Sequence, residues 1–199
     1  MMSKDRLVFL ISDENWKFLV HEFNVDDICH LISYKDSMAL AYDLFFKNLY
    51  SDEFQDFAVR LFFAIRKAYH AEWNTDWKND AFLGKLCSIT WRYDEMYEFY
   101  KKAYDKLTDP PDSLLLLLAS CNSAPGVPPI NDQESEEYLQ KAITKKITYE
   151  AALMMKGLAR DKEDKEQEGY WDRICLELEK NNVHTEIIIP DVLLAQNRR

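Results

Sequence analysis

Residues 36–69 read DSMALAYDLFFKNLYSDEFQDFAVRLFFAIRKAY, and this stretch determines the fold class. Its apolar residues recur every three or four positions, which is the period of an α-helix with one buried face. Between the two periodic runs stands Ser51-Asp52-Glu53, a capping residue followed by two acids, which is typical of a helix start. The stretch therefore predicts a helical hairpin, with one helix from Asp36 to Leu49 and a longer one from Ser51 to Tyr69.

The helical pattern continues on both sides of this hairpin. Towards the N-terminus, Ser12-Asp13-Glu14 and Asp26-Asp27 each precede a short apolar run, so two short helices are expected to open the fold. Residues 122–129 are the only stretch dense in helix breakers, and we expect a loop there because a helical pattern resumes directly after it. Further helices are predicted at 79–91, 94–107, 132–145, 149–160 and 166–180, with a shorter one starting at 114.

The two ends of the chain are less regular. The segment from Glu186 to Leu194 is apolar but interrupted by Pro190, which predicts an extended conformation, and Leu7 to Ile11 is a candidate partner for it. We therefore predict an all-α fold in one helical domain over residues 1–199. Its parts are short helices in 1–35, three to four hairpins in 36–180 and a tail in 181–199.

A pentad with the order apolar, polar, Lys, Ala, apolar recurs along the predicted helices. Its copies occupy residues 65–69, 100–104 and 139–143, and a weaker copy occupies 171–175. An Ala at this position lets one helix approach its neighbour closely. The pentad indicates repeated helical hairpins, and a bundle without true repeats is the alternative.

The spacing of the pentads resembles the tetratricopeptide repeat. In residues 77–110, Leu83-Gly84, Tyr100, Ala103 and the closing Asp109-Pro110 match that pattern. The resemblance implies a right-handed α-α superhelix with a concave binding face. The positions that depart from the pattern are Asp80, Cys87 and Met96.

Composition excludes several classes of protein. Hydrophobic residues make up 47% of the 199 residues and charged ones 30%, which is typical of a folded chain, and four glycines are too few for Gly-rich phosphate loops. The formal net charge of -10 argues against nucleic acid or an anionic membrane as a partner. A basic protein is the partner that this charge favours.

The cysteines and the N-terminus indicate a cytoplasmic protein. The only apolar run near the N-terminus has five residues, 7–11, which is too short for a signal peptide or a membrane span. The cysteines are widely separated and stand among apolar residues, so they are expected to be reduced and buried. They are Cys29, Cys87, Cys121 and Cys175.

The sequence contains none of the common phosphate-binding, zinc-protease, hydrolase or EF-hand motifs, so we expect no enzyme, cofactor or metal. His21, Asp26, Cys29 and His30 carry atoms that can bind metal. Cys29 and His30 are adjacent, however, and would point apart on a helix. Capping or core roles are therefore favoured for this cluster.

His70 is the most plausible candidate for catalysis. Carboxylates at Glu72 and Asp76 and the aromatic rings of Trp73 and Trp77 follow it, and together they could form an acid/base pocket. Aromatic residues at a helix end more often pack between helices. A helical enzyme that uses His70 stays an alternative.

Negative charge is concentrated near the N-terminus. Residues 1–56 hold eleven acids and five bases, and residues 57–102 hold six acids and eight bases. Such an excess produces self-repulsion unless a partner neutralises it. A second acidic patch, at Asp132, Glu134, Glu136 and Glu137, is explained by a helix N-terminus. The predicted partner-binding residues are Asp26, Asp27, Asp43, Asp52, Glu53, Asp56, Trp73 and Trp77.

These observations predict a non-enzymatic protein-binding module. In size, charge and helicity it is similar to the acidic helical immunity proteins and antitoxins of bacteria, which neutralise a toxin by covering its functional surface. That likeness implies a basic toxin domain, such as a nuclease, as the partner. The alternative is a tetratricopeptide-like scaffold or regulator that binds a peptide in its concave groove.

Overall fold

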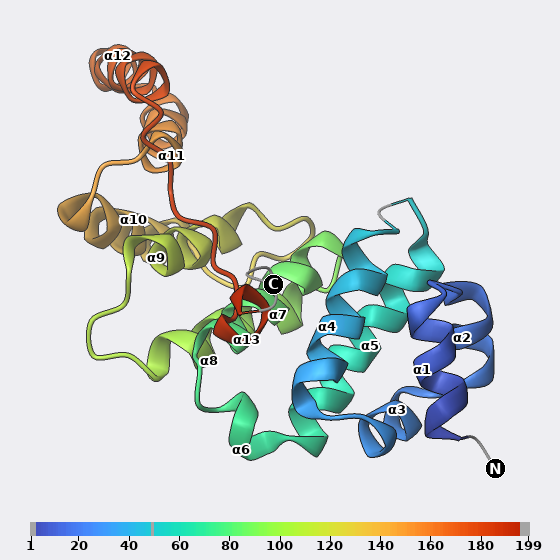
Figure 1. Ribbon diagram of the computed structural model, residues 1–199. Helices are drawn as coiled ribbons and strands as arrows, with labels where there is room; N and C mark the ends of the chain where they lie inside the picture. Colours follow the sequence, from blue (N-terminus) through green and yellow to red (C-terminus); the bar gives the residue numbers. More distant parts are fainter. Residues whose placement is uncertain (1–2, 49, 196–199) are drawn as a thin grey trace. The chain divides into compact units, whose positions relative to one another are not determined.

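The computed structural model describes residues 3–48 and 50–195 (Figure 1). Within these residues the chain forms helices α1 to α13 and one 3-10 helix, and it contains no strand. The prediction of an all-α fold is confirmed. No helix in the described ranges is long and apolar enough to cross a membrane.

The chain divides into two compact units, Met1–Arg92 with Ile189–Arg199 and Tyr93–Ile188. One helical domain over the whole chain stays a prediction, because two compact units can still fold as one cooperative domain. The first unit contains α1 (Lys4–Ser12), α2 (Trp16–Glu22), α3 (Val25–Leu31), α4 (Tyr34–Phe46), α5 (Asp52–Ala68), α6 (His70–Trp73), α7 (Lys78–Ile89) and α13 (Asp191–Leu194). The second contains α8 (Tyr93–Asp105), α9 (Asp112–Ala119), the 3-10 turn Ser120–Ser123, α10 (Asp132–Lys145), α11 (Tyr149–Asp161) and α12 (Lys165–Lys180).

The predicted hairpin of residues 36–69 forms α4 and α5, which pack against each other (Figure 1). Helix α4 begins two residues earlier than predicted, because the side chain of Ser33 caps it by accepting a hydrogen bond from the backbone N–H of Asp36. Phe45 and Phe62, one from each helix, are fully buried. The apolar period read from the sequence therefore corresponds to the core of the first unit.

Tyr69 fixes the end of α5 against α3. Its hydroxyl lies 2.6 Å from the carbonyl oxygen of Cys29 and also contacts the carbonyl oxygen of Ile32. These carbonyls belong to the last turn of α3, where backbone acceptors have no partner inside the helix. A single side chain thus stabilises the end of a short helix that could not persist alone.

The prediction that residues 7–11 form an extended segment is wrong. They belong to α1, which starts at Lys4 because the side chain of Ser3 caps it, with its Oγ 3.2 Å from the backbone nitrogen of Arg6. Leu7 and Leu10 are fully buried, and their spacing of three residues is helical. Residues 183–190 have no regular secondary structure and pair with no strand, and 191–194 form α13.

Among the residues that the structure describes, four helices end on a residue other than glycine in the left-handed region. In each case the next backbone N–H donates to the carbonyl oxygen five residues earlier, at 2.8 to 2.9 Å, which is the bond of a Schellman motif. This explains how so many helices can end in a chain with four glycines. The four residues are Glu14 (φ 50°), Trp91 (φ 63°), Glu163 (φ 58°) and Asn182 (φ 53°).

The second unit is built from the pairs α9 with α10 and α11 with α12. Small residues lie where its helices meet, since Ala142 of α10 and Ala151 of α11 are fully buried in one apolar cluster. Ala103 of α8 is also fully buried, whereas Ala68, its counterpart in the first pentad, is exposed. Burial thus agrees with the pentad at two positions of three, and the superhelical stacking of a tetratricopeptide array stays a prediction.

Residues 183–185 hold the start of α11. The backbone N–H of Tyr149 donates to the carbonyl oxygen of Val183 at 2.9 Å, and the N–H of Thr185 donates to Glu150 at 2.8 Å. The Nδ1 atom of His184 lies 2.8 Å from the other carboxylate oxygen of Glu150. The tail thereby provides an acceptor for the backbone N–H of Tyr149, in the first turn of α11, and polar contacts for both oxygens of the Glu150 carboxylate.

The chain then returns to the first unit through α13. The side chain of Asp191 forms an ion pair with Lys78 at 2.7 Å, and the backbone N–H of Asp191 donates to the carboxylate of Asp76 at 2.9 Å. Leu193 is buried, and α13 packs against α4. The first unit therefore includes residues from both ends of the sequence.

Candidate protein-binding surface

The six predicted carboxylates all lie in the first unit, but on three different helices. Asp26 and Asp27 are in the first turn of α3, and Asp43 is in α4. The remaining three lie on α5, two of them in its first turn, where negative charge interacts favourably with the helix dipole. They are Asp52, Glu53 and Asp56.

Several of these charges already have partners within the chain. Asp56 accepts from Arg60 Nε at 2.9 Å and from Arg92 Nη2 at 2.7 Å. Asp43 lies 3.2 Å from the ammonium group of Lys47. The negative charge near the N-terminus is therefore partly neutralised without any partner molecule.

Division of the charge by compact unit changes the interpretation of the sequence. Residues 1–92 and 189–199 hold 15 acids and 13 bases, a formal net charge of -2. Residues 93–188 hold 20 acids and 12 bases, a formal net charge of -8. The acidic excess of residues 1–56 is offset by basic residues that belong to the same unit, and most of the net charge belongs to the second unit.

Trp73 is a core residue. Its side chain is 1% exposed, and its indole N–H donates to Oδ1 of Asp80 at 2.9 Å. Asp80 is itself 2% exposed and lies 3.5 Å from Nε of Arg66, while the side-chain amide of Asn79 donates to the carbonyl oxygen of Trp73 at 2.8 Å. A partner could not reach this indole without opening the fold, so Trp73 has a core position and not the predicted position of an anchor. Trp77, directly before α7, is half-buried.

Trp91 is an exposed aromatic residue that the sequence did not mark as a candidate. Its side chain is 75% exposed, and Ile89, two residues earlier, is 43% exposed. Both lie at the end of α7 beside the start of α5, where they line a pocket of about 240 Å³. The other lining residues are Asp52, Gln55, Asp56, Thr90 and Arg92.

This pocket, which we call the Trp91 pocket, combines two kinds of chemistry. The face of an indole ring attracts cations, and the carboxylates of Asp52 and Asp56 accept hydrogen bonds from guanidinium or ammonium groups. Trp91 occupies the left-handed position of the Schellman motif that ends α7, where glycine would carry less strain. The sequence signal was a tryptophan at the last position of the predicted helix 79–91.

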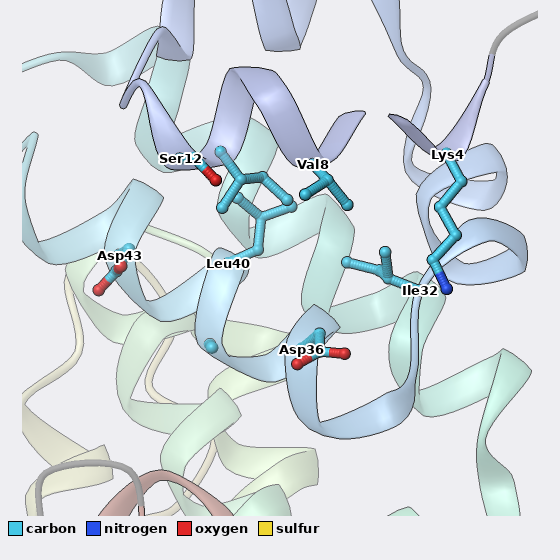
Figure 2. A pocket seen from close by; sticks show the side chains of 9 residues that line it. Lys4, Val8, Ser12, Ile32, Asp36, Leu40 and Asp43 are labelled. Atoms are coloured by element: carbon cyan, nitrogen blue, oxygen red, sulfur yellow. The ribbon is translucent and has the colours of Figure 1, made fainter. Parts of the chain in front are cut away.

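A second hollow lies between α1 and α4, and we call it the α1–α4 groove (Figure 2). Its volume is about 320 Å³. Figure 2 shows the side chains of Val8 and Leu40 directed towards each other from the two helices, with Asp36 and Asp43 along the α4 border and Lys4 towards one end. The remaining lining residues are Ile11, Ser12, Ile32 and Ala39.

His70 is the first residue of α6 and is exposed, and its Nε2 is 3.0 Å from the side-chain nitrogen of Asn74. Asp76 is engaged elsewhere, since it accepts from the backbone N–H groups of Lys78 and Asp191. Within the described ranges, no carboxylate lies at ion-pair distance from His70. An enzyme that uses His70 stays a prediction.

The groups with the largest pKa shifts line neither of the two hollows. All four cysteines are free and buried, as predicted, and burial raises the pKa of Cys29 to about 11 and that of Cys121 to about 12. Burial also raises the pKa of Tyr34 to about 12. A thiol that stays protonated is a poor nucleophile, so these cysteines are not candidates for catalysis. In the part of the chain that the structure describes, no three His, Cys, Asp or Glu side chains are grouped so that they could hold a metal ion.

No protein-family model, curated protein or solved structure matches this chain.

Proposed function

We propose that this chain is a non-enzymatic protein-binding module that captures a basic partner protein. Its most specific form is an inhibitor that acts as immunity proteins and antitoxins do, by covering the functional surface of a basic toxin domain. The observation that carries the proposal is the Trp91 pocket, in which an aromatic ring that is 75% exposed lies beside the carboxylates of Asp52 and Asp56.

The proposed mechanism has two stages. The net charge of -10 attracts a basic partner over distances of about 10 Å at moderate salt, which raises the rate of association. An Arg or Lys side chain of the partner then lies against the indole ring of Trp91 with its charged end near Asp52. A desolvated cation on an aromatic face contributes on the order of 2 kcal/mol, and aromatic anchors of this kind dominate binding energies.

The proposal is tested with Trp91→Gly and a matched control. Glycine is well suited to the left-handed position, so this variant should fold normally while losing the indole ring. Glu163→Gly makes the same backbone change at another Schellman position, in the second unit. Each protein serves as bait in a lysate of the cells that make it, and retained proteins are purified and titrated against both variants.

We expect the retained partner to be basic and its dissociation constant to rise at least tenfold in Trp91→Gly, with little change in Glu163→Gly. Asp52→Lys with Glu53→Lys should mainly lower the association rate. The matched charge control is Glu163→Lys with Glu166→Lys, because both residues are exposed and lie outside the pocket. An acidic partner, or equal affinity for both glycine variants, would refute the proposal.

A further inference from the structure

We infer that the α1–α4 groove receives one amphipathic helix of a basic partner protein. This helix carries Lys or Arg at two positions seven residues apart and apolar residues between them. The inference rests on the proposed function only for the sign of the partner's charge, since the groove shares no lining residue with the Trp91 pocket.

The spacing of the carboxylates determines the pattern of the partner. Asp36 and Asp43 both line the groove from α4, and a separation of seven residues corresponds to two helical turns, or about 10.5 Å along the axis. Ala39 and Leu40 lie between them in the lining. A helix laid along α4 would repeat this spacing, with basic residues at i and i+7 and apolar residues at i+3 and i+4.

Both carboxylates keep acceptor capacity for a partner. Asp36 accepts a hydrogen bond from the hydroxyl of Ser33 at 2.7 Å, and Asp43 lies 3.2 Å from Lys47. An ionised carboxylate has about four acceptor sites, so one such contact leaves room for a Lys or Arg. Charge complementarity therefore favours a basic helix over a neutral or acidic one.

The opposite wall of the groove is apolar. Val8 of α1 is 45% exposed although it faces Leu40 across the groove (Figure 2). Lys4, at one end, places the only positive charge among the lining residues. Basic side chains of the partner are therefore accommodated along the α4 border, and its apolar side chains meet Val8 and Ile11.

The position of the groove also favours a helix. It lies between two helices, and a groove of this kind is the usual acceptor for the apolar face of a third helix. A second copy of this chain is the competing occupant.

The probe is a synthetic helical peptide, acetylated and amidated, with Lys at i and i+7, Leu at i+3 and i+4, and Ala and Gln elsewhere. Two control peptides carry Glu or Gln in place of both Lys residues. Each peptide is titrated into the full chain while backbone amide NMR shifts are recorded, and sedimentation velocity reports whether the chain itself dimerises.

Two exposed residues provide matched variants of the chain. Val8→Lys places a positive charge in the groove, and Phe18→Lys makes the same kind of change at an exposed α2 residue that does not line it. Asp36→Asn with Asp43→Asn removes both charges but keeps an oxygen that Ser33 can donate to. Trp91→Gly tests whether the groove acts independently of the Trp91 pocket.

We expect the Lys peptide to shift amides in α1 and α4 and to bind about tenfold more weakly to Val8→Lys, with less than a twofold change in Phe18→Lys and Trp91→Gly. The double Asn variant should lose the preference for the Lys peptide over the Gln peptide. The inference is overturned by any of three results: no saturable shift at millimolar peptide, equal affinity for the Glu peptide, or a dimer that Val8→Lys disrupts. Peptide binding in the groove without capture of any basic protein would refute the proposed function and leave this inference standing.

Discussion

Replacement of Trp73 by Phe tests whether this residue belongs to the core. The side chain is 1% exposed, and its indole N–H donates to Asp80, which is 2% exposed. Phenylalanine fills most of the space but has no donor. The substitution therefore leaves a buried carboxylate oxygen without one of its hydrogen bonds and creates a small cavity beside it.

The magnitude follows from these two losses. An unmet buried hydrogen-bonding group costs about 1–3 kcal/mol, and more when it is charged. The cavity adds about 24 cal/mol for each Å³ that does not close, or about 1 kcal/mol for a void of 40 Å³. We therefore expect Trp73→Phe to lower the free energy of unfolding by about 2–4 kcal/mol, which is a large share of the 5–15 kcal/mol typical of a protein.

Urea denaturation followed by circular dichroism measures this change, and Trp77→Phe is the matched control because Trp77 is half-buried. The partner's affinity for the folded variant should be unchanged. A loss of stability below 0.5 kcal/mol, or weaker binding by a variant of unchanged stability, would contradict a core role. The sequence-based choice of Trp73 as an anchor would then be restored.

Further predictions concern helix packing, local strain, protonation and thiol access. Ala103→Trp should lower the free energy of unfolding by about 1–3 kcal/mol because Ala103 is fully buried, and Lys102→Ala should cost under about 0.5 kcal/mol; equal effects in urea denaturation would contradict the packing at α8. Gly157→Ala should raise the free energy of unfolding by about 0.5–1 kcal/mol, because the added Cβ meets no atom within 4 Å in the middle of α11; a loss of stability would show that α11 packs differently. Partial burial acts to raise the pKa of Glu150, but its hydrogen bonds from the tail lower that pKa overall, so these bonds should stabilise the fold above pH 4.5 and lose this effect as the pH falls further; amide exchange of the tail should lose this dependence in Glu150→Gln. A thiol reagent should label the native protein slowly, Cys121 among the slowest, and denaturation should expose four thiols; fast native labelling of Cys121 would contradict its burial.

The positions of the helices could be predicted because periodicity is a local property. The hairpin of α4 and α5 and the helices α10 to α12 were predicted with most of their ends correct to within about two residues. The exception is the end of α4, which lies three residues before the predicted end. The beginning of α1 was missed because Ser3 is a weak signal in isolation, although the spacing of Leu7 and Leu10 was helical. The left-handed conformation of Trp91 and Glu163 at the ends of α7 and α11 could not be predicted, because glycine is the residue that usually marks this position.

The candidate site was harder to predict because burial depends on the tertiary fold. Trp73 and Trp91 are both aromatic residues near a helix end, and nothing in their neighbouring residues distinguishes the one that contacts Asp80 in the core from the one that is exposed. Charge behaves in the same way. The acids of residues 1–56 stand apart from Arg92 in the sequence, yet Arg92 contacts Asp56 in the fold.

The return of the chain to the first unit constrains the order in which the protein can be completed during synthesis. Residues 93–188 lie between Arg92 and the segment that supplies α13, so the contacts of Asp191 with Asp76 and Lys78 must wait until these 96 residues have been made. At a translation rate of about 5–20 residues per second, this delay is roughly 5–20 s. During that interval the surface of α4 that packs against α13 is uncovered on the nascent chain, where a chaperone can bind it.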